Sequence, residues 1–144
     1  MQIELALNPA PEDDKAVLDG LIAFNEAKGG PSGYQPVSIF VRDDDGKTIG
    51  GLVARIGYDW MFVELLHLPE TVRRQGFGTQ LMQQAEAFAR QRGLAGIWLD
   101  TYSFQARGFY EKLGYSVFGT LEGHPIGGNR FFLQKRFGVP STTT

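Results

Sequence analysis

The stretch that most constrains the fold lies between residues 60 and 100, where two apolar runs flank a helical pattern. The first run, WMFVELLHL at 60–68, is typical of a strand and stops before a proline. From 79 to 92, apolar residues recur at helical spacing, and a glycine follows. The second run, LAGIWLD at 94–100, indicates a strand covered on both faces. Together they predict a parallel strand–helix–strand unit, which requires a layered α/β domain.

Shorter patterns extend this unit in both directions. Alternating apolar residues predict an N-terminal strand, and the helical spacing that follows predicts a helix ended by a glycine pair. Two apolar runs around an Asp-Gly turn predict a β-hairpin. A short helix and two strands are expected near the C-terminus. In chain order these segments are 1–7, 8–30, 36–57, 106–113, 116–120 and 130–137.

Composition limits the classes of function. A net charge of −2 offers no basic surface for nucleic acid or for an anionic membrane. The chain has no cysteine, which excludes disulfides and a thiol nucleophile, and its two histidines, His67 and His124, are too few for a histidine-rich metal site. No segment approaches the roughly 20 apolar residues that span a bilayer, and the N-terminus lacks signal-peptide features. We expect one cytoplasmic domain over 1–144, with 139–144 as a flexible tail, and no metal.

The segment RRQGFGTQL at 73–81 leads into the central helix. A helix N-terminus offers unpaired N–H groups, and glycines at 76 and 78 let an anion approach the backbone. Arg73 and Arg74 add donors that suit phosphate oxygens. The segment therefore predicts a phosphate or pyrophosphate site, although glycines that merely allow tight strand–helix packing remain an alternative. It is neither a Walker loop, which needs GK[ST], nor a dinucleotide fingerprint, because Leu81 replaces the third glycine.

The pattern R-x-x-G-x-G at 73–78 resembles the [QR]-x-x-G-x-[GA] loop of the GNAT superfamily of N-acetyltransferases, which binds the pyrophosphate of acetyl-CoA. The strand before the loop, the helix and strand after it, and a later A-x-x-x-Y motif, Ala106 to Tyr110, follow that family's order. The resemblance covers roughly 37–137. The segment SFQARGFYEKLGY, with the later VFG and HP, also resembles small bacterial members whose substrate is unassigned. One departure is Ser103, where the family often has asparagine.

The resemblance implies the GNAT fold: a mixed, mostly antiparallel sheet of six to seven strands, helices on both faces, and a splayed parallel pair. The splayed strands would be 60–68 and 94–100, with the pantetheine of acetyl-CoA between them. A main-chain N–H near Leu66–Leu68 would polarise the thioester carbonyl. The residues expected to bind acetyl-CoA are Leu66, His67, Leu68, Arg73, Arg74, Gln75, Gly76, Phe77, Gly78, Thr79, Ser103, Ala106 and Phe109.

Acetyl transfer to an amine needs a base for the ammonium and a donor for the leaving thiolate. Tyr110 matches the family position near the sulfur and is expected to be the general acid; a purely packing role is the alternative. By the same resemblance, Glu64 is expected to be the base, because an acidic residue on this strand often deprotonates the amine through water in the family. A charged residue is also unusual in a covered strand; an outward-facing residue or a structural salt bridge is the alternative. His67 is the rival base, since its ordinary pKa of about 6.5 suits that work. His124 is expected to be a loop residue.

The expected function is acetyl-CoA-dependent acetylation of a small-molecule amine in a ternary complex. Protein lysine or N-terminal acetylation, and a non-catalytic acyl-CoA-binding module, are the alternatives, and a homodimer is left open. Trp98, Phe88 and Phe109 are expected in the core. Four aromatic residues near turns could either line an acceptor pocket or cover the core: Tyr34, Tyr58, Trp60 and Tyr102.

Overall fold

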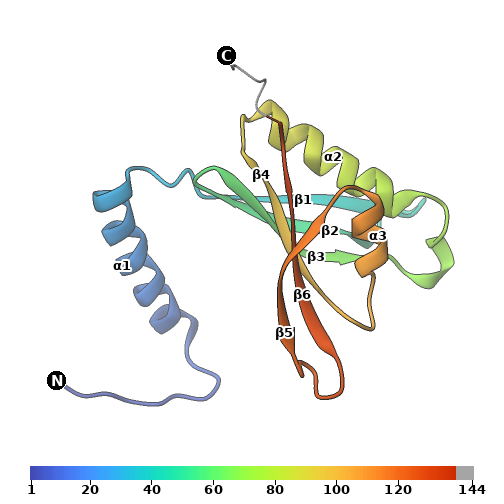
Figure 1. Cartoon of the computed structure of the whole chain (residues 1–144). Coiled ribbons are helices and arrows are strands. Elements are labelled where there is room, and N and C mark those ends of the chain that lie inside the picture. The colour runs from blue at the N-terminus through green and yellow to red at the C-terminus, as the bar shows by residue number, and fades with distance from the viewer. Residues whose placement is uncertain (139–144) are drawn as a thin grey trace. The chain divides into compact units, whose positions relative to one another are not determined.

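The structure, a computed structural model, describes residues 1–138 of the 144-residue chain (Figure 1). Its internal contacts divide the chain into two compact units, Met1–Gly33 and Tyr34–Thr144. The predicted tail at 139–144 lies outside the described residues. One domain over the whole chain, and the homodimer, stay predictions. No helix within the described residues is both long enough and apolar enough to cross a membrane.

The first unit contains one helix, α1 (Pro11–Gly29), as the sequence predicted. A proline at its start, three acidic residues in its first turn and Gly30 at its C-cap explain its limits. The predicted strand at 1–7 is wrong, because these residues form no strand. Alternation alone does not make a strand, since its N–H and C=O groups also need a neighbour to pair with. Within the described chain, α1 buries no residue.

The second unit is built on one mixed sheet. Its strands follow the order β1-β2-β3-β4-β6-β5. Only the β3–β4 pair is parallel among the described pairs, and the other four pairs are antiparallel. The expected mixed, mostly antiparallel sheet is therefore confirmed with six strands. The sequence also predicted a strand at residues 1–7, and these residues are not part of the sheet. The strands are β1 (Gln35–Arg42), β2 (Thr48–Gly57), β3 (Trp60–His67), β4 (Gly96–Tyr102), β5 (Ser116–Glu122) and β6 (Asn129–Arg136).

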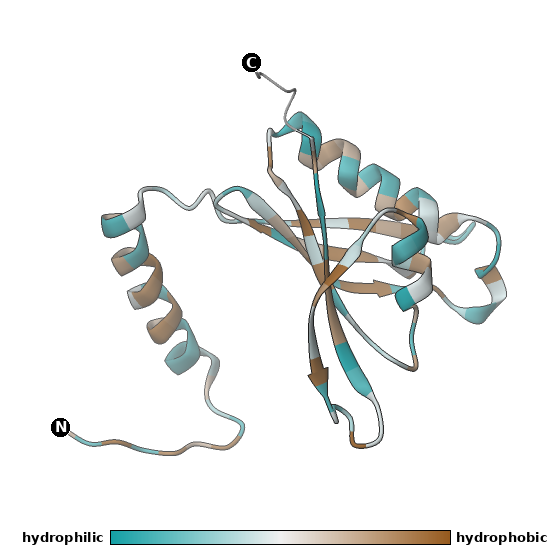
Figure 2. Cartoon of the chain, in the orientation of Figure 1, coloured by the Kyte–Doolittle hydropathy of each residue, from teal (hydrophilic) through white to brown (hydrophobic). Residues whose placement is uncertain are grey.

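The two helices of the second unit share the core on one side of this sheet, so the expectation of helices on both faces is not met within this unit. The apolar stripe of α2 (Phe77–Gln91) is buried at Leu81, Met82, Ala85 and Ala89, and α3 (Arg107–Lys112) buries Tyr110. The buried residues of both helices and alternate residues of the central strands form one hydrophobic cluster. Phe88 and Phe109 pack against this cluster, as expected. Figure 2 shows the apolar positions along the strands and the polar outer surface of α2. A single-turn 3-10 helix, η1 (Glu70–Val72), links β3 to α2.

The opposite face of the sheet carries aromatic side chains. Trp98 lies there, so its predicted place in the core is wrong: strand alternation turns it away from Ile97 and Leu99, which are buried. Its ring stacks on Phe62, with centroids 4.1 Å apart. A surface hollow of about 230 Å³ lies beside this stack, at the beginning of β3 and β4. Its lining residues are Tyr34, Arg55, Ile56, Gly57, Trp60, Phe62 and Trp98.

Candidate active site

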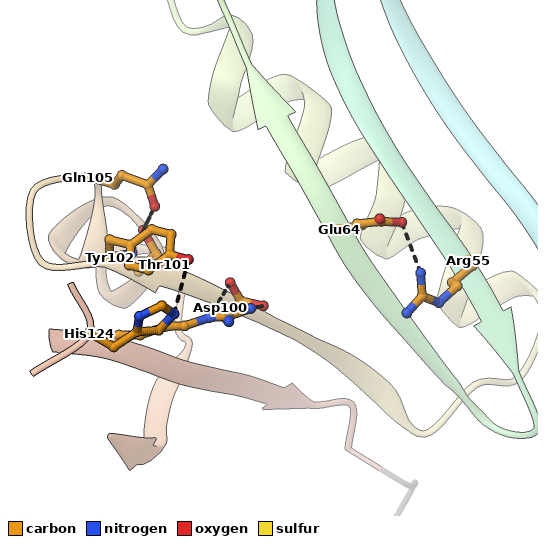
Figure 3. Close-up of polar contacts among 8 residues, drawn as sticks. Arg55, Glu64, Asp100, Thr101, Tyr102, Gln105 and His124 are labelled. Atoms are coloured by element: carbon orange, nitrogen blue, oxygen red, sulfur yellow. Dashed lines mark hydrogen bonds and ion pairs between the residues drawn. The ribbon is translucent and has the colours of Figure 1, made fainter. Parts of the chain in front are cut away.

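The parallel strands β3 and β4 separate before they end. Their pairing runs from Trp60–Gly96 to Val63–Leu99 and stops, although β3 continues to His67 and β4 to Tyr102. Figure 3 shows the two strands diverging, with Glu64 on one and Asp100 on the other. Beyond Val63, the β4-facing edge of β3 has no ladder partner in the described sheet. This is the splayed pair that the resemblance predicted, and an extended ligand could pair with that free edge.

Glu64 lies at an irregularity in β3. The β2–β3 register passes from Ala54–Val63 to Val53–Leu65, so Glu64 is an extra residue without a ladder partner in the described sheet. A β-bulge of this kind re-aims a side chain and is frequent beside active sites. Arg55 Nη1 lies 2.9 Å from Glu64 Oε2, and its guanidinium also lies over the Phe62 ring. Glu64 is therefore held on the aromatic face, at the first position after the strands part.

The loop after η1 places Gly76 at the N-cap of α2. Gly76 has φ +83°, a left-handed conformation that favours glycine. A Cβ built there would meet only Gln80 Nε2 among the described atoms within 4 Å, at 4.0 Å, so the space before it is open. Gln80 donates to the carbonyl of Gly76, which leaves the N–H groups of 77–79 without helical partners. This geometry is compatible with an anion, and the predicted phosphate site stays a prediction.

The other loop residues have more varied roles. Arg73 Nε donates to the carbonyl oxygen of Leu68 at 2.9 Å, which ties the loop to the end of β3. Arg74 has φ +65°, and Gln75 donates to a carbonyl oxygen four residues back. A Cβ at Gly78 would lie 3.2 Å from the Phe109 ring. Tight packing therefore explains Gly78, whereas backbone conformation and open space explain Gly76.

Tyr110 combines a buried ring with an open hydroxyl. The residue is 7 % exposed and its ring contacts those of Phe109 and Tyr115 edge to face. Its hydroxyl has no hydrogen-bond partner within residues 1–138, and no fully buried side-chain N or O atom there lacks one, so the oxygen reaches the surface. Burial, and then the carboxylate of Asp100, raise the pKa of Tyr110 to about 12. The hydroxyl is an unengaged donor at neutral pH.

The turn between β4 and α3 fixes the approach to Tyr110. Thr101 Oγ1 donates to Gln105 and accepts the N–H of Ala106 at 3.4 Å, which connects the end of β4 to the start of α3. Ser103 Oγ accepts the N–H of Asn129 at 3.1 Å. A hydroxyl that accepts one hydrogen bond still has its own hydrogen to donate, so the predicted pantetheine contact of Ser103 stays open.

The sequence reasoning missed Asp100 and Arg130. Asp100 follows the last β3–β4 pair, and Arg130 of β6 contacts it through Nε–Oδ1 at 3.1 Å and Nη2–Oδ2 at 2.9 Å. This double hydrogen bond raises the already high pKa of Arg130 further. An acidic residue inside the apolar run 94–100 was the available signal. Its partner Arg130 could not be found from the sequence, because β6 pairs with β4 although β5 lies between these two strands along the chain.

Both histidines lie near these elements. His67 is exposed at the end of β3, whereas His124 Nε2 lies 3.4 Å from the hydroxyl oxygen of Tyr102. Tyr102 stacks on Phe104 near the end of β4, while Trp60 and Tyr34 line the hollow at the other end of the strands. Tyr58 is exposed in the turn between β2 and β3. The four aromatic residues considered for an acceptor pocket therefore do not gather in one place.

Known proteins carry the same sequence pattern. The Acetyltransferase (GNAT) family matches residues 3–115. The acetyltransferase Atu2258 of Agrobacterium fabrum is 38% identical over 126 residues, which are 88% of this chain and 92% of that protein. The blasticidin-S acetyltransferase of Streptomyces morookaense is 37% identical over 83 residues, covering 57% of this chain and 61% of that protein.

Solved structures agree in fold. A crystal structure described as an acetyltransferase from Agrobacterium tumefaciens superposes with a TM-score of 0.89 at 36% identity, covering 95% of this chain and all of that one. A Bacillus anthracis protein of the streptothricin acetyltransferase type, solved with acetyl coenzyme A, has a TM-score of 0.62 at 22% identity, covering 80% of this chain and 68% of that one. The chain belongs to the acetyltransferase (GNAT) family.

Proposed function

We propose that this protein transfers the acetyl group of acetyl-CoA directly to a primary amine of a small molecule, in the cytoplasm. The observation that carries the proposal is the opening between β3 and β4, where Glu64 follows the last β3–β4 pair. Tyr110 of α3 has an open hydroxyl whose pKa is raised in part by Asp100 of β4. Family membership supports the donor. A relative named for acetylating blasticidin S supports a small-molecule acceptor.

The chain's own groups fit acetyl-CoA, which would supply an activated acetyl thioester. The free N–H groups of 77–79 and the open space before Gly76 suit a pyrophosphate. The unpaired edge of β3 suits the amide groups of an extended pantetheine chain. An N–H of that edge, near Leu66, would donate to the thioester carbonyl oxygen as its negative charge develops.

Glu64 and Tyr110 would handle the protons. Glu64 accepts a proton from the acceptor's ammonium through water, which frees the amine to attack the thioester carbonyl. Arg55 holds the Glu64 carboxylate on the aromatic face. Tyr110 donates a hydrogen bond to the leaving sulfur. Since its pKa of about 12 lies well above the roughly 8.5 of a thiol, stabilising the thiolate by a hydrogen bond is favoured over complete proton transfer.

A broad amine panel tests this function. Release of free thiol from acetyl-CoA is measured with small-molecule amines, and with peptides bearing lysine or free N-termini. We expect thiol release with particular small amines and none without an acceptor. Acetyl-CoA binding without turnover on any compound would show a binding module instead, and turnover on peptides alone would show a protein acetyltransferase.

A further inference from the structure

Two arginine–carboxylate pairs flank the opening between β3 and β4, and only the pair of Arg55 and Glu64 enters the chemistry proposed above. The other pair joins Asp100 to Arg130 across neighbouring strands. Asp100 lies opposite Phe132 in the β4–β6 register, so Arg130 is its diagonal neighbour on the same face. Asp100 therefore borders the opening on β4, and Arg130 lies beside it on the same face, one strand farther from Glu64.

The geometry of the pair leaves part of the Arg130 guanidinium free. A guanidinium has five N–H donors, and Asp100 takes one from Nε and one from Nη2. The remaining three, on Nη1 and Nη2, have no acceptor elsewhere in the part of the chain that the structure describes. The side chain is 30% exposed, so solvent or a ligand can reach it.

The Arg130 side chain is also held in place. Its guanidinium carbon lies 5.5 Å from the centroid of the Tyr102 ring and 5.2 Å from that of Phe132. Together with the double contact to Asp100, these rings restrict the rotamers of the arginine. A fixed guanidinium with one free edge is pre-organised for a planar anion, a carboxylate above all, which it can bind through two parallel hydrogen bonds.

The register relates this anion site to the amine. Glu64 and Asp100 each come one residue after the last β3–β4 pair, and the stack of Phe62 on Trp98 shows that the two strands present this face together. Arg130 is on the next strand beyond Asp100. Two strand spacings amount to about 10 Å, and the splay adds to that. An acceptor that reaches both groups must separate its amine from its anion by several bonds.

We propose that Arg130, positioned by Asp100, binds a carboxylate of the acceptor, and that the acceptor class is ω-amino carboxylates. The inference rests on the proposed acetyltransferase function, and it names the substrate class of that same site. Arg130 is then a specificity-determining residue, and Asp100 a positioning residue. A purely structural ion pair would affect stability without distinguishing acceptors by their carboxylate.

Matched acceptor pairs test the inference. With saturating acetyl-CoA, kcat/KM is measured for γ-aminobutyrate against n-propylamine, and for ε-aminocaproate against n-pentylamine; each pair differs by the carboxylate alone. Methyl esters of the two acids remove the charge and retain most of the bulk. We expect the wild-type protein to prefer the free acids by about 10- to 100-fold, mainly through KM, as for a hydrogen bond between charged groups.

Three variants assign the preference. R130Q should abolish it, and the double variant D100N/R130Q should abolish it without leaving a carboxylate unpaired. The control R136Q removes another arginine of β6, which lies over Trp60 at the far end of the strand, and should keep the preference. Melting temperatures show that each variant is folded. Equal use of acids and amines by the wild-type protein, or a preference that survives in both R130 variants, would overturn the inference.

Binding distinguishes failure of this inference from failure of the proposed function. If no amine is acetylated, the proposed function is wrong, and calorimetric titration of γ-aminobutyrate and n-propylamine into the CoA-saturated protein still decides the role of Arg130. Binding of the acid that R130Q weakens at least tenfold would support the carboxylate site. Equal affinities for acid and amine, or no binding of either, would overturn it.

Discussion

At the scale of single residues, two neighbouring tyrosines differ in what their hydroxyls do. Tyr110 has an open hydroxyl, whereas the hydroxyl of Tyr115 donates to Glu86 Oε2 at 2.9 Å. We expect Tyr110→Phe to lower kcat by about 10²-fold, the usual scale for loss of a positioned acid or donor. The acetyl-CoA Kd and the melting temperature should change little, because the ring remains. Steady-state kinetics and calorimetry measure these quantities.

Tyr115→Phe is the matched control, since it removes a hydroxyl from the adjoining ring. It leaves Glu86 with its Lys135 contact and should lower stability by about 1 kcal/mol without changing kcat. Full kcat in Tyr110→Phe, with chemistry rate-limiting, would leave Tyr110 a packing role only.

The raised pKa of Tyr110 also predicts how stability depends on pH. Between pH 10 and 12 the unfolded phenol loses its proton while the folded one keeps it, so the native state binds more protons. The raised pKa therefore contributes about 3 kcal/mol to the free energy of unfolding. This contribution is complete below pH 10 and is lost as the pH rises toward 12. Urea unfolding measures the free energy of unfolding at pH 9 and at pH 11. Its decrease between the two pH values should be smaller for Tyr110→Phe than for the wild-type protein. Equal declines would contradict the raised pKa.

The base assignment is tested by two substitutions on β3. Glu64→Gln keeps the side-chain shape but cannot accept the amine proton, so kcat should fall by 10²- to 10⁴-fold, the typical cost of losing a general base. Acetyl-CoA affinity should stay near that of the wild-type protein. His67→Ala should retain most activity, as measured by thiol release. The reverse pattern would make His67 the base.

At the scale of elements, α2 provides its own control, because a left-handed glycine adjoins each end. Gly76 and Gly93 have φ +83° and +72°, and a Cβ would meet no close contact at either. Alanine at either position should cost about 1 kcal/mol in backbone strain. Only Gly76→Ala should also weaken acetyl-CoA binding, and Gly76→Glu should abolish it. Equal acetyl-CoA affinity in all three folded variants, by calorimetry, would remove the anion site from this loop.

Local patterns predicted most elements of the second unit. The hairpin was marked by an Asp-Gly turn, and α2 by its stripe and by Gly93. The pattern at 1–7 failed because a strand depends on a neighbouring strand, which three alternating apolar residues do not supply. Trp98 was misplaced because a continuous apolar run does not show which face is covered.

At the scale of the whole molecule, the candidate site assembles residues far apart in the sequence. The motif at 73–78 and Tyr110 could be proposed from the sequence, because their spacing is local and matches a family; their roles stay predictions. The Asp100–Arg130 pair could not, since it depends on β6 lying beside β4 and on the register between them. The bulge at Glu64 is likewise a property of pairing with β2, which no single segment encodes.

Acetyl-CoA binding should stabilise the folded chain as a whole. A ligand that binds only the native state adds about 2.7 kcal/mol at a hundredfold excess over its Kd. Thermal unfolding with acetyl-CoA should therefore show a raised melting temperature in the wild-type protein and none in a folded Gly76→Glu variant. The same rise in both proteins would place the acetyl-CoA site elsewhere.

The most direct test of direct acetyl transfer follows a radiolabelled acetyl group. The protein is incubated with labelled acetyl-CoA, with and without the amine found by the panel, and the label is measured in the protein and small-molecule fractions. Direct transfer predicts that label enters the amine only when protein and amine are both present, and that the denatured protein carries no covalently bound label. Label bound covalently to the protein, or none in the amine, would contradict the account.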